Sequence, residues 1–279
     1  YLTIFRGVDH TMKLALAIAG EKALPSAFVV FRGFSESMRK AAALGYDGVE
    51  LALKHPNEID KNELSSMLAK YRLEVSCISS GQVYAALGYA FTDSQPERRA
   101  ELKSIFTGLI DLAADYGQMV NIGRVRGPVK DGNREEADKL FIDMAQQLCD
   151  YAAPKGVTMI LEPVNRYEIN YINSVEEGVA LLQKAGIANL KLMPDVFHMN
   201  IEDAQIGPTL EKNIDLVGYI HLADSNRHAP GDGHLDFDDV FRCIKRAGYD
   251  RWCSVEILPY PDPDTAAARA IKYLHPYFV

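Results

Sequence analysis

The sequence predicts an α/β protein, a single (β/α)8 barrel spanning residues 1–279, and two observations carry this prediction. Eight short apolar runs alternate with segments of helical character along the whole chain, which is the pattern of repeated strand-helix units. Most of these runs are continuously apolar, as parallel strands buried on both faces are. The length of 279 residues is slightly above the usual size of such barrels, about 250 residues.

The expected strands lie at intervals along the whole chain. They occupy residues 13–19, 48–51, 74–79, 119–123, 158–162, 190–193, 217–221 and 253–257. Helix starts are expected at Asp60, Asn133 and Ser174, because each precedes a glutamate by three residues, as in a capping box. Gly45 and Gly186 follow helical stretches, where a left-handed residue commonly ends a helix.

Other organisations of the chain are less consistent with the sequence. A doubly wound open sheet is the structural alternative, but no G-x-G-x-x-G motif follows an early strand. No linker or low-complexity segment divides the chain, so we expect one domain.

The composition disfavours several classes of partner. The formal net charge is −8, from 30 Lys and Arg against 38 Asp and Glu, and nucleic-acid binding requires clustered positive charge instead. No apolar stretch reaches the roughly 20 residues that cross a membrane. The four cysteines form no C-x-x-C pair, which predicts reduced thiols and a cytoplasmic location. The chain begins at Tyr1, and removal of a preceding segment is left open.

Four residues that can bind metal stand at the ends of the last four expected strands: Glu162, Asp195, His221 and Glu256. In a parallel barrel the carboxyl ends of the strands meet on one rim, so these side chains are expected to converge there. One such residue alone could be a solvated loop residue, but four in succession predict a site for one divalent metal ion. The oxygen-rich set favours Mn²⁺ or Mg²⁺. Co²⁺ is compatible, and so is Zn²⁺, although no thiolate or second histidine favours it.

Other polar residues follow the same strands. His198 lies three residues after Asp195, and Arg227 follows His221 in the next loop. Taken alone, His198 is typical of a helix start and Arg227 of a surface loop. Their position beside the expected ligands makes both candidates for the site. Glu168, just beyond Glu162, adds a second carboxylate to that loop.

Three residues after earlier strands have two interpretations each. Glu50 ends the second strand and could either orient a ligand or take part in the chemistry. Arg124 and Arg126 follow the fourth strand and could bind an anionic group of a substrate. A salt bridge at the rim is the interpretation that we favour for the two arginines.

The segments around these residues resemble a known family. LEPVNRYE at residues 161–168, DVFHMNIE at 195–202, HLADSNRHAPGDG at 221–233 and the final Val-Glu256 are similar to the sugar isomerase/epimerase family of xylose-isomerase-like barrels. Within it the chain most resembles the ketose 3-epimerase branch, which includes D-tagatose and D-psicose 3-epimerases. Residues 1–155 resemble the family only in the alternation of strands and helices.

The resemblance implies roles for individual residues. Glu162, Asp195, His221 and Glu256 would be metal ligands. Glu162 and Glu256 would also be the catalytic pair, which moves a proton next to the carbonyl of a ketose through a cis-enediolate. The resemblance gives substrate contacts to Glu168, His198 and Arg227. The expected partner is a small sugar, and self-association into a homo-oligomer is left open.

Related functions remain as alternatives. An inosose dehydratase or a hydroxypyruvate isomerase would use a similar site, and a binding protein without turnover would not need two carboxylates around its ligand. An apurinic-site endonuclease is disfavoured by the net charge of −8. The chain departs from the family pattern after the first strand, which ends in LAIAG without aromatic residues, and in the GRVRG loop at 123–127. These departures leave the exact sugar open.

Overall fold

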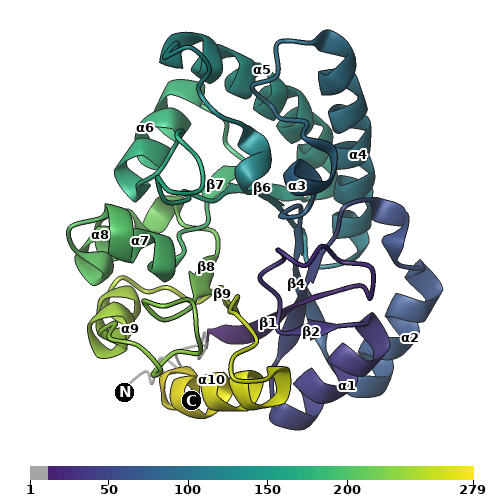
Figure 1. Ribbon diagram of the computed structural model, residues 1–279, viewed down its shortest axis with the longest axis vertical. Helices are drawn as coiled ribbons and strands as arrows, with labels where there is room; N and C mark the ends of the chain where they lie inside the picture. The colour runs from purple at the N-terminus through teal and green to yellow at the C-terminus, as the bar shows by residue number, and fades with distance from the viewer. Residues whose placement is uncertain (1–11) are drawn as a thin grey trace, which may run out of the picture.

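The computed structural model describes residues 12–279 and places eight parallel strands around a closed barrel (Figure 1). Hydrogen-bonded neighbours follow the order β7-β6-β5-β4-β3-β1-β9-β8, and every ladder is parallel. Two isolated parallel bridges, Leu192 with Val217 and Asp195 with His221, join β7 to β8 and close the ring. The predicted barrel is therefore confirmed.

Each expected strand has a counterpart in the structure. The strands are β1 (Lys13–Ala19), β2 (Phe31–Arg32), β3 (Gly48–Ala52), β4 (Glu74–Ser79), β5 (Met119–Ile122), β6 (Thr158–Leu161), β7 (Leu190–Leu192), β8 (Ile220–Leu222) and β9 (Trp252–Val255). The expected start of β8 at residue 217 is wrong, because a 3-10 turn at Ile214–Leu216 holds the Val217 N–H and leaves Val217 with a single bridge. The short strand β2 was not expected, and it pairs only with β1.

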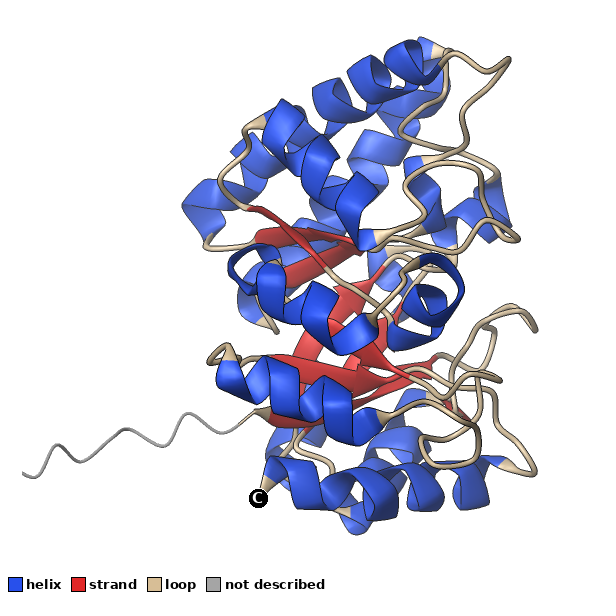
Figure 2. Ribbon diagram, turned by 90° about the vertical axis from the view of Figure 1, so that its left-hand side faces the viewer, coloured by secondary structure: helices blue, strands red, loops and turns tan. Residues whose placement is uncertain are grey.

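Helices surround the strands, and the longer loops gather at one end of the barrel (Figure 2). The helices are α1 (Phe34–Leu44), α2 (Lys61–Tyr71), α3 (Val83–Leu87), α4 (Pro96–Asp115), α5 (Arg134–Ala152), α6 (Val175–Ala185), α7 (Val196–Glu202), α8 (Ile206–Lys212), α9 (Phe237–Arg246) and α10 (Pro263–Phe278). Among residues 12–279 no helix combines the length and the apolar character needed to traverse a membrane.

The expected helix ends are confirmed in detail. The side chains of Asp60, Asn133 and Ser174 accept backbone N–H groups at the starts of α2, α5 and α6. Gly45 and Gly186 adopt the left-handed conformation at the ends of α1 and α6, with φ of 93° and 65°. Local capping therefore sets where these helices begin and end.

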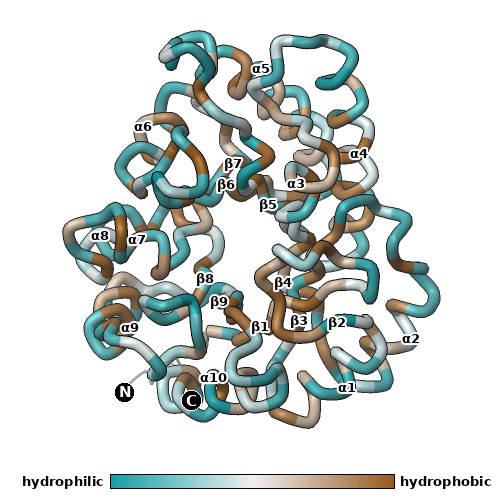
Figure 3. Tube along the Cα trace, viewed as in Figure 1, coloured by the Kyte–Doolittle hydropathy of each residue, from teal (hydrophilic) through white to brown (hydrophobic). Residues whose placement is uncertain are grey.

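The core lies between the strands and the helices, and the strands appear as apolar segments near the centre of the trace (Figure 3). Leu16 and Ile18 of β1 belong to the same buried cluster as Ala270 and Leu274 of α10. The four cysteines are buried and unpaired, as expected. Because side chains alternate along a strand, β3 sends Val49 and Leu51 into this core and directs Glu50 the other way, into the barrel.

Candidate metal centre

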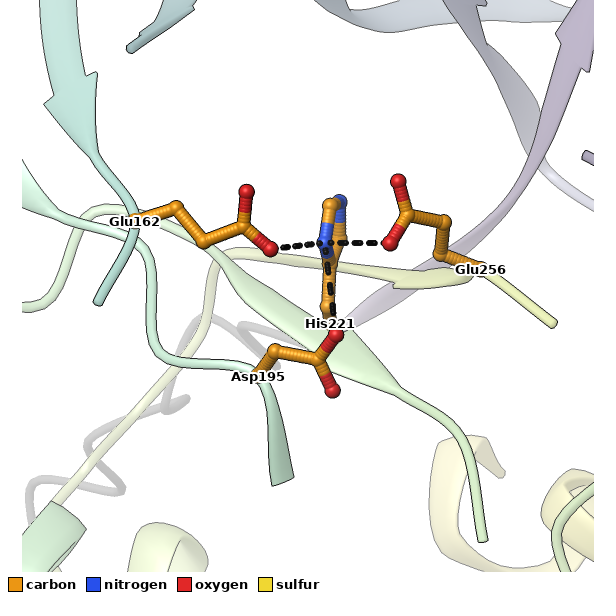
Figure 4. Close-up of side chains that lie close together, drawn as sticks. All are labelled: Glu162, Asp195, His221 and Glu256. Carbon is orange, nitrogen blue, oxygen red and sulfur yellow. Dashed lines mark ion pairs between the residues drawn. The ribbon is translucent and has the colours of Figure 1, made fainter. Parts of the chain in front are cut away.

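The structure brings Glu162, Asp195, His221 and Glu256 together (Figure 4). Glu162 and Glu256 directly follow β6 and β9, His221 lies within β8, and Asp195 is the N-cap of α7. One candidate ligand atom from each residue lies within 4.8 Å of those of the other three. The convergence predicted from strand ends is thus present in the fold.

The imidazole of His221 lies at the centre of the cluster. Its Nδ1 is 3.4 Å from Glu162 Oε1, 3.5 Å from Glu256 Oε2 and 4.0 Å from Asp195 Oδ2. Nδ1 is buried and has no hydrogen-bond partner, which is costly for a polar atom unless another group binds it. A divalent cation held by Nδ1 and three carboxylates would satisfy this atom, so the residues present fit such an ion.

Glu50 lies behind the cluster and holds His221 from its other side. Glu50 Oε2 is 2.9 Å from His221 Nε2 and accepts a hydrogen bond of 3.2 Å from the Tyr219 hydroxyl. Glu50 and His221 are both fully buried. Of the two roles expected for Glu50, the structure supports the orienting one, because this hydrogen bond turns Nδ1 toward the carboxylates.

The two glutamates differ in protonation. Burial alone would raise the pKa of Glu162, but the nearby His221, His198 and Arg227 lower it to about 2. Burial raises the pKa of Glu256 to about 8, against the opposing effects of His221 and Arg227. Burial would lower the pKa of His221, but Glu50 and Glu256 outweigh it and raise this pKa well above its ordinary value. At neutral pH and without a cation, Glu162 is ionised while Glu256 and His221 hold protons.

The residues expected to contact a substrate line a cavity next to the cluster. Glu168, His198 and Arg227 all face it, together with Glu162 and Glu256. His198 Nε2 lies 3.8 Å from Glu162 Oε1 and 3.9 Å from Asp195 Oδ2. Burial lowers the pKa of His198, which favours the neutral ring.

Arg227 connects the cluster to the aromatic wall of this cavity. Its guanidinium donates to Asp195 Oδ2 at 2.5 Å and to Glu256 Oε2. The rings of Phe28 and Phe197 lie 4.6 and 4.8 Å from the guanidinium carbon. Phe28 comes from the segment between β1 and β2, which the sequence analysis did not single out because no motif or spacing marks it.

The two arginines after β5 have different positions. Arg124 lines the cavity and forms a loose ion pair with Glu168 at 3.8 Å, which agrees with the expected salt bridge. For Arg126 both expected roles are wrong. It is fully buried in the turn after β5 and donates to four backbone carbonyls, those of Gly123, Glu162, Tyr171 and Ile172. It therefore joins two loops through backbone carbonyls.

Other polar residues near the cavity were missed. Asn121 Nδ2 lies 3.4 Å from Glu162 Oε2, and Gln82 joins two backbone segments beside the cavity. Asn165 contacts both His198 and Glu168. Asn165 belongs to the segment that carried the resemblance, so its sequence position was a usable signal. Asn121 and Gln82 lie in segments without a recognisable motif, so no signal in the sequence marked either of them.

Comparison with known proteins places the chain among enzymes of sugar chemistry. The family model described as "Xylose isomerase-like TIM barrel" matches residues 38–277. An L-ribulose 3-epimerase of Methylomonas sp. (strain DH-1) is 31% identical over 228 residues, which cover 78% of this chain and 76% of that protein. A hydroxypyruvate isomerase of Escherichia coli (strain K12) is 24% identical over 88% of this chain and 93% of its own length. The crystal structure of a D-allulose 3-epimerase from Methylomonas sp. has the same fold, with a TM-score of 0.80, 24% identity and coverage of 96% of this chain and 98% of that one.

Proposed function

The chain belongs to the xylose isomerase-like TIM barrel family, and on that basis we propose that it is a metal-dependent sugar epimerase acting on a ketose. The observation that carries this proposal is the pair Glu162 and Glu256. Their carboxyl groups face one another across the His221 ring (Figure 4), at the wall of one cavity. A group on each side of a bound ketose is what inversion at a carbon next to a carbonyl requires.

The chemistry assigned to the pair is proton transfer. One carboxylate takes the proton from the carbon next to the carbonyl, and the electron pair of that C–H bond moves toward the carbonyl oxygen to give an enediolate. The other carboxyl group then gives a proton to the opposite face of the same carbon. A divalent cation held by Glu162, Asp195, His221 and Glu256 would supply electrostatic stabilisation of the oxygen that gains charge. In the metal-free protein the pKa of Glu162 is about 2 and that of Glu256 about 8, so the two carboxyl groups differ in their affinity for a proton, which supports a division into base and acid.

The remaining residues of the cavity are assigned to binding and orientation. His198 and Arg227 are buried beside the carboxylates and place donors toward the reacting part of a sugar. Glu168 and Arg124 lie together in the cavity wall, where they can accept from and donate to hydroxyl groups. Phe28 and Phe197 pack against the buried guanidinium of Arg227.

The test is deuterium exchange measured by proton NMR. The Mg²⁺-loaded protein in deuterium oxide should introduce deuterium next to the carbonyl of at least one ketose, and excess chelator should stop the exchange. The position of the label separates 3-epimerisation from aldose–ketose isomerisation. Glu162→Gln and Glu256→Gln should each lower the exchange rate by about a thousandfold or more.

A matched control is Glu202→Gln, because Glu202 belongs to α7 after the adjacent strand but is bound to Arg166 and lies outside the cavity lining. This variant should keep the wild-type rate. Full exchange in either Glu162→Gln or Glu256→Gln would refute the two-carboxylate mechanism while leaving the family assignment intact.

A second candidate is an isomerase of a hydroxy-oxo acid. It is favoured by Arg124 in the cavity wall and by the hydroxypyruvate isomerase that aligns over 88% of this chain. Arg124→Ala should then raise KM for the acidic substrate far more than for its neutral analogue. A dehydratase acting on an inosose would instead release water, which mass analysis of the product detects.

A further inference from the structure

Asn165 is a buried side chain in the loop after β6 with a partner on each side of its amide. Its Oδ1 accepts the backbone N–H of Tyr167 at 3.0 Å. Its Nδ2 lies 3.2 Å from Glu168 Oε1 and 2.8 Å from His198 Nδ1. Asn165 therefore contacts two of the three residues assigned to substrate binding, although it is not itself among the residues that line the cavity.

The orientation of this amide is determined by its neighbours. A backbone N–H can only donate, so the atom facing Tyr167 must be the amide oxygen. An ionised carboxylate can only accept, so the atom facing Glu168 must be the amide nitrogen. Both neighbours independently give the same orientation, which leaves an N–H of Asn165 directed at the ring of His198.

The amide in turn determines which ring nitrogen of His198 carries hydrogen. Nδ1 receives the Asn165 N–H and must accept, so in the neutral ring the hydrogen is on Nε2. Nε2 lies 3.8 Å from Glu162 Oε1 and 3.9 Å from Asp195 Oδ2, at the edge of the cavity. Anionic oxygens on that side favour an N–H there over a lone pair.

We propose that Asn165 is a positioning residue that fixes His198 as an N–H donor, through Nε2, to the substrate oxygen that gains negative charge. His198 keeps its proton throughout, while Glu162 and Glu256 move the proton at carbon. The neighbouring His221 is held in the opposite sense, because Glu50 takes its Nε2 and leaves Nδ1 for the cluster. Two buried histidines thus present opposite functions, a donor and a ligand, to one site. The catalytic part of this inference rests on the proposed function, but the tautomer of His198 does not.

The decisive variant is Asn165→Asp, which keeps the shape of the side chain. One carboxylate oxygen can still accept the Tyr167 N–H, so the turn is preserved. The other oxygen cannot donate to His198, and it should draw the hydrogen to Nδ1 and leave a lone pair at Nε2. The change also removes the bond that Asn165 donates to Glu168. The control is Asn170→Asp in the same loop, which loses one donated bond, to the Val129 carbonyl, at an exposed position.

The experiment is nitrogen-15 NMR of histidine-labelled protein loaded with Mg²⁺, with the His198 signals identified by their loss in His198→Gln. Wild type and Asn170→Asp should show hydrogen on Nε2 and a bare Nδ1, and Asn165→Asp should show the reverse. If the protein epimerises a ketose, Asn165→Asp should lower kcat about a hundredfold with a much smaller change in KM, as loss of one preorganised donor does.

Each outcome decides the inference. Hydrogen on Nδ1 of His198 in the wild type, or on both ring nitrogens, would overturn it without any variant. An unchanged tautomer in Asn165→Asp would overturn the role of Asn165 whatever happens to kcat. A correct tautomer in a protein that exchanges no ketose proton would support the positioning of His198 and count against the proposed function alone.

Discussion

Glu256 and His221 are the two residues of the cluster that must lose protons before a cation can bind. Burial raises the pKa of Glu256 to about 8, and nearby carboxylates raise the pKa of His221 well above its ordinary value. A metal ligand must be a carboxylate or a bare ring nitrogen, so protons compete with the ion at these two sites. Glu162, with a pKa of about 2, is already ionised and adds no such competition.

This competition gives a pH dependence of known sign. Because the pKa of Glu256 is raised to about 8, its carboxyl is protonated below that pH, and the affinity for Mn²⁺ should fall as the pH falls. The expected slope is about tenfold per pH unit for each displaced proton. Titrations of Mn²⁺ followed by electron paramagnetic resonance at pH 6, 7 and 8 measure it. Glu256→Gln should bind more weakly with a shallower slope, and affinity independent of pH in the wild type would contradict this picture.

Glu50 tests the orientation of His221 separately from the ligands. In Glu50→Gln the amide oxygen can still accept the Nε2–H, but the negative charge behind the ring is gone. Such a loss should weaken Mn²⁺ binding by about 10- to 100-fold, since partners of ligating histidines commonly contribute that much. The same resonance titration measures it, with Glu202→Gln as a control that should match the wild type. An unchanged Mn²⁺ affinity would show that Glu50 is not needed to hold the imidazole.

At the scale of elements, the turn after β5 is held to the loop after β6 by one side chain. Arg126 donates to Tyr171 O at 2.7 Å, Ile172 O at 2.9 Å, and both Gly123 O and Glu162 O at 3.0 Å. Each of these carbonyls would lose a buried partner if the guanidinium were removed. Arg126 therefore stabilises the loop that carries Glu162, in addition to the contacts within that loop.

Arg126→Met keeps much of the volume of this side chain and removes its donors. We expect the free energy of unfolding to fall by about 3 kcal/mol, because the carbonyls of Glu162 and Tyr171 lose their donor and those of Gly123 and Ile172 lose one of two. Urea unfolding followed by circular dichroism measures the change. Arg124→Met, two residues away but partly exposed, should change it by only about 0.5 kcal/mol. Similar losses in the two variants would mean that the buried hydrogen bonds of Arg126 are not what stabilises this region.

Elements whose cause is local could be predicted from sequence, and those that depend on distant partners could not. The strands β1 and β4 have the predicted bounds, because continuous apolar runs and flanking turns define them. The strand β2 consists of two residues that are extended only because they pair with Ile18 and Ala19. Arg126 was misjudged for the same reason, since no periodicity shows that a turn points its side chain inward.

The candidate site divides in the same way. Glu162, Asp195, His221 and Glu256 could be predicted to converge, because strand ends of a barrel share one rim. The contacts of Phe28 with Arg227 and of Asn165 with His198 depend on loop conformations that no spacing encodes. The sequence therefore identifies which residues can bind a metal more readily than which residues position them.

At the scale of the whole molecule, the four candidate ligands lie on both sides of a weakly paired seam of the barrel, between β7 and β8. Continuous ladders join the other neighbouring strands, except for a single paired position between β4 and β5. Between β7 and β8 there are only the bridges of Leu192 with Val217 and of Asp195 with His221. Asp195 lies on one side of this seam and His221 on the other. A cation bound to both would link the two edges, so metal binding should also stabilise the closure of the barrel.

Hydrogen exchange can measure this closure directly. The seam amides of Gly218 and His221 donate to Leu192 O at 2.8 Å and Pro194 O at 2.9 Å, and opening of the seam exposes them. Mg²⁺ at about 100 times its dissociation constant adds about 2.7 kcal/mol, so exchange of these amides should slow by about a hundredfold relative to chelator-treated protein. Leu64 is the one buried residue of α2, and the amides of this helix that exchange by local fraying should keep their rates. Equal slowing in α2 and in the seam would indicate that the ion acts only on global unfolding. No slowing at the seam would mean that the barrel closes without help from the cluster.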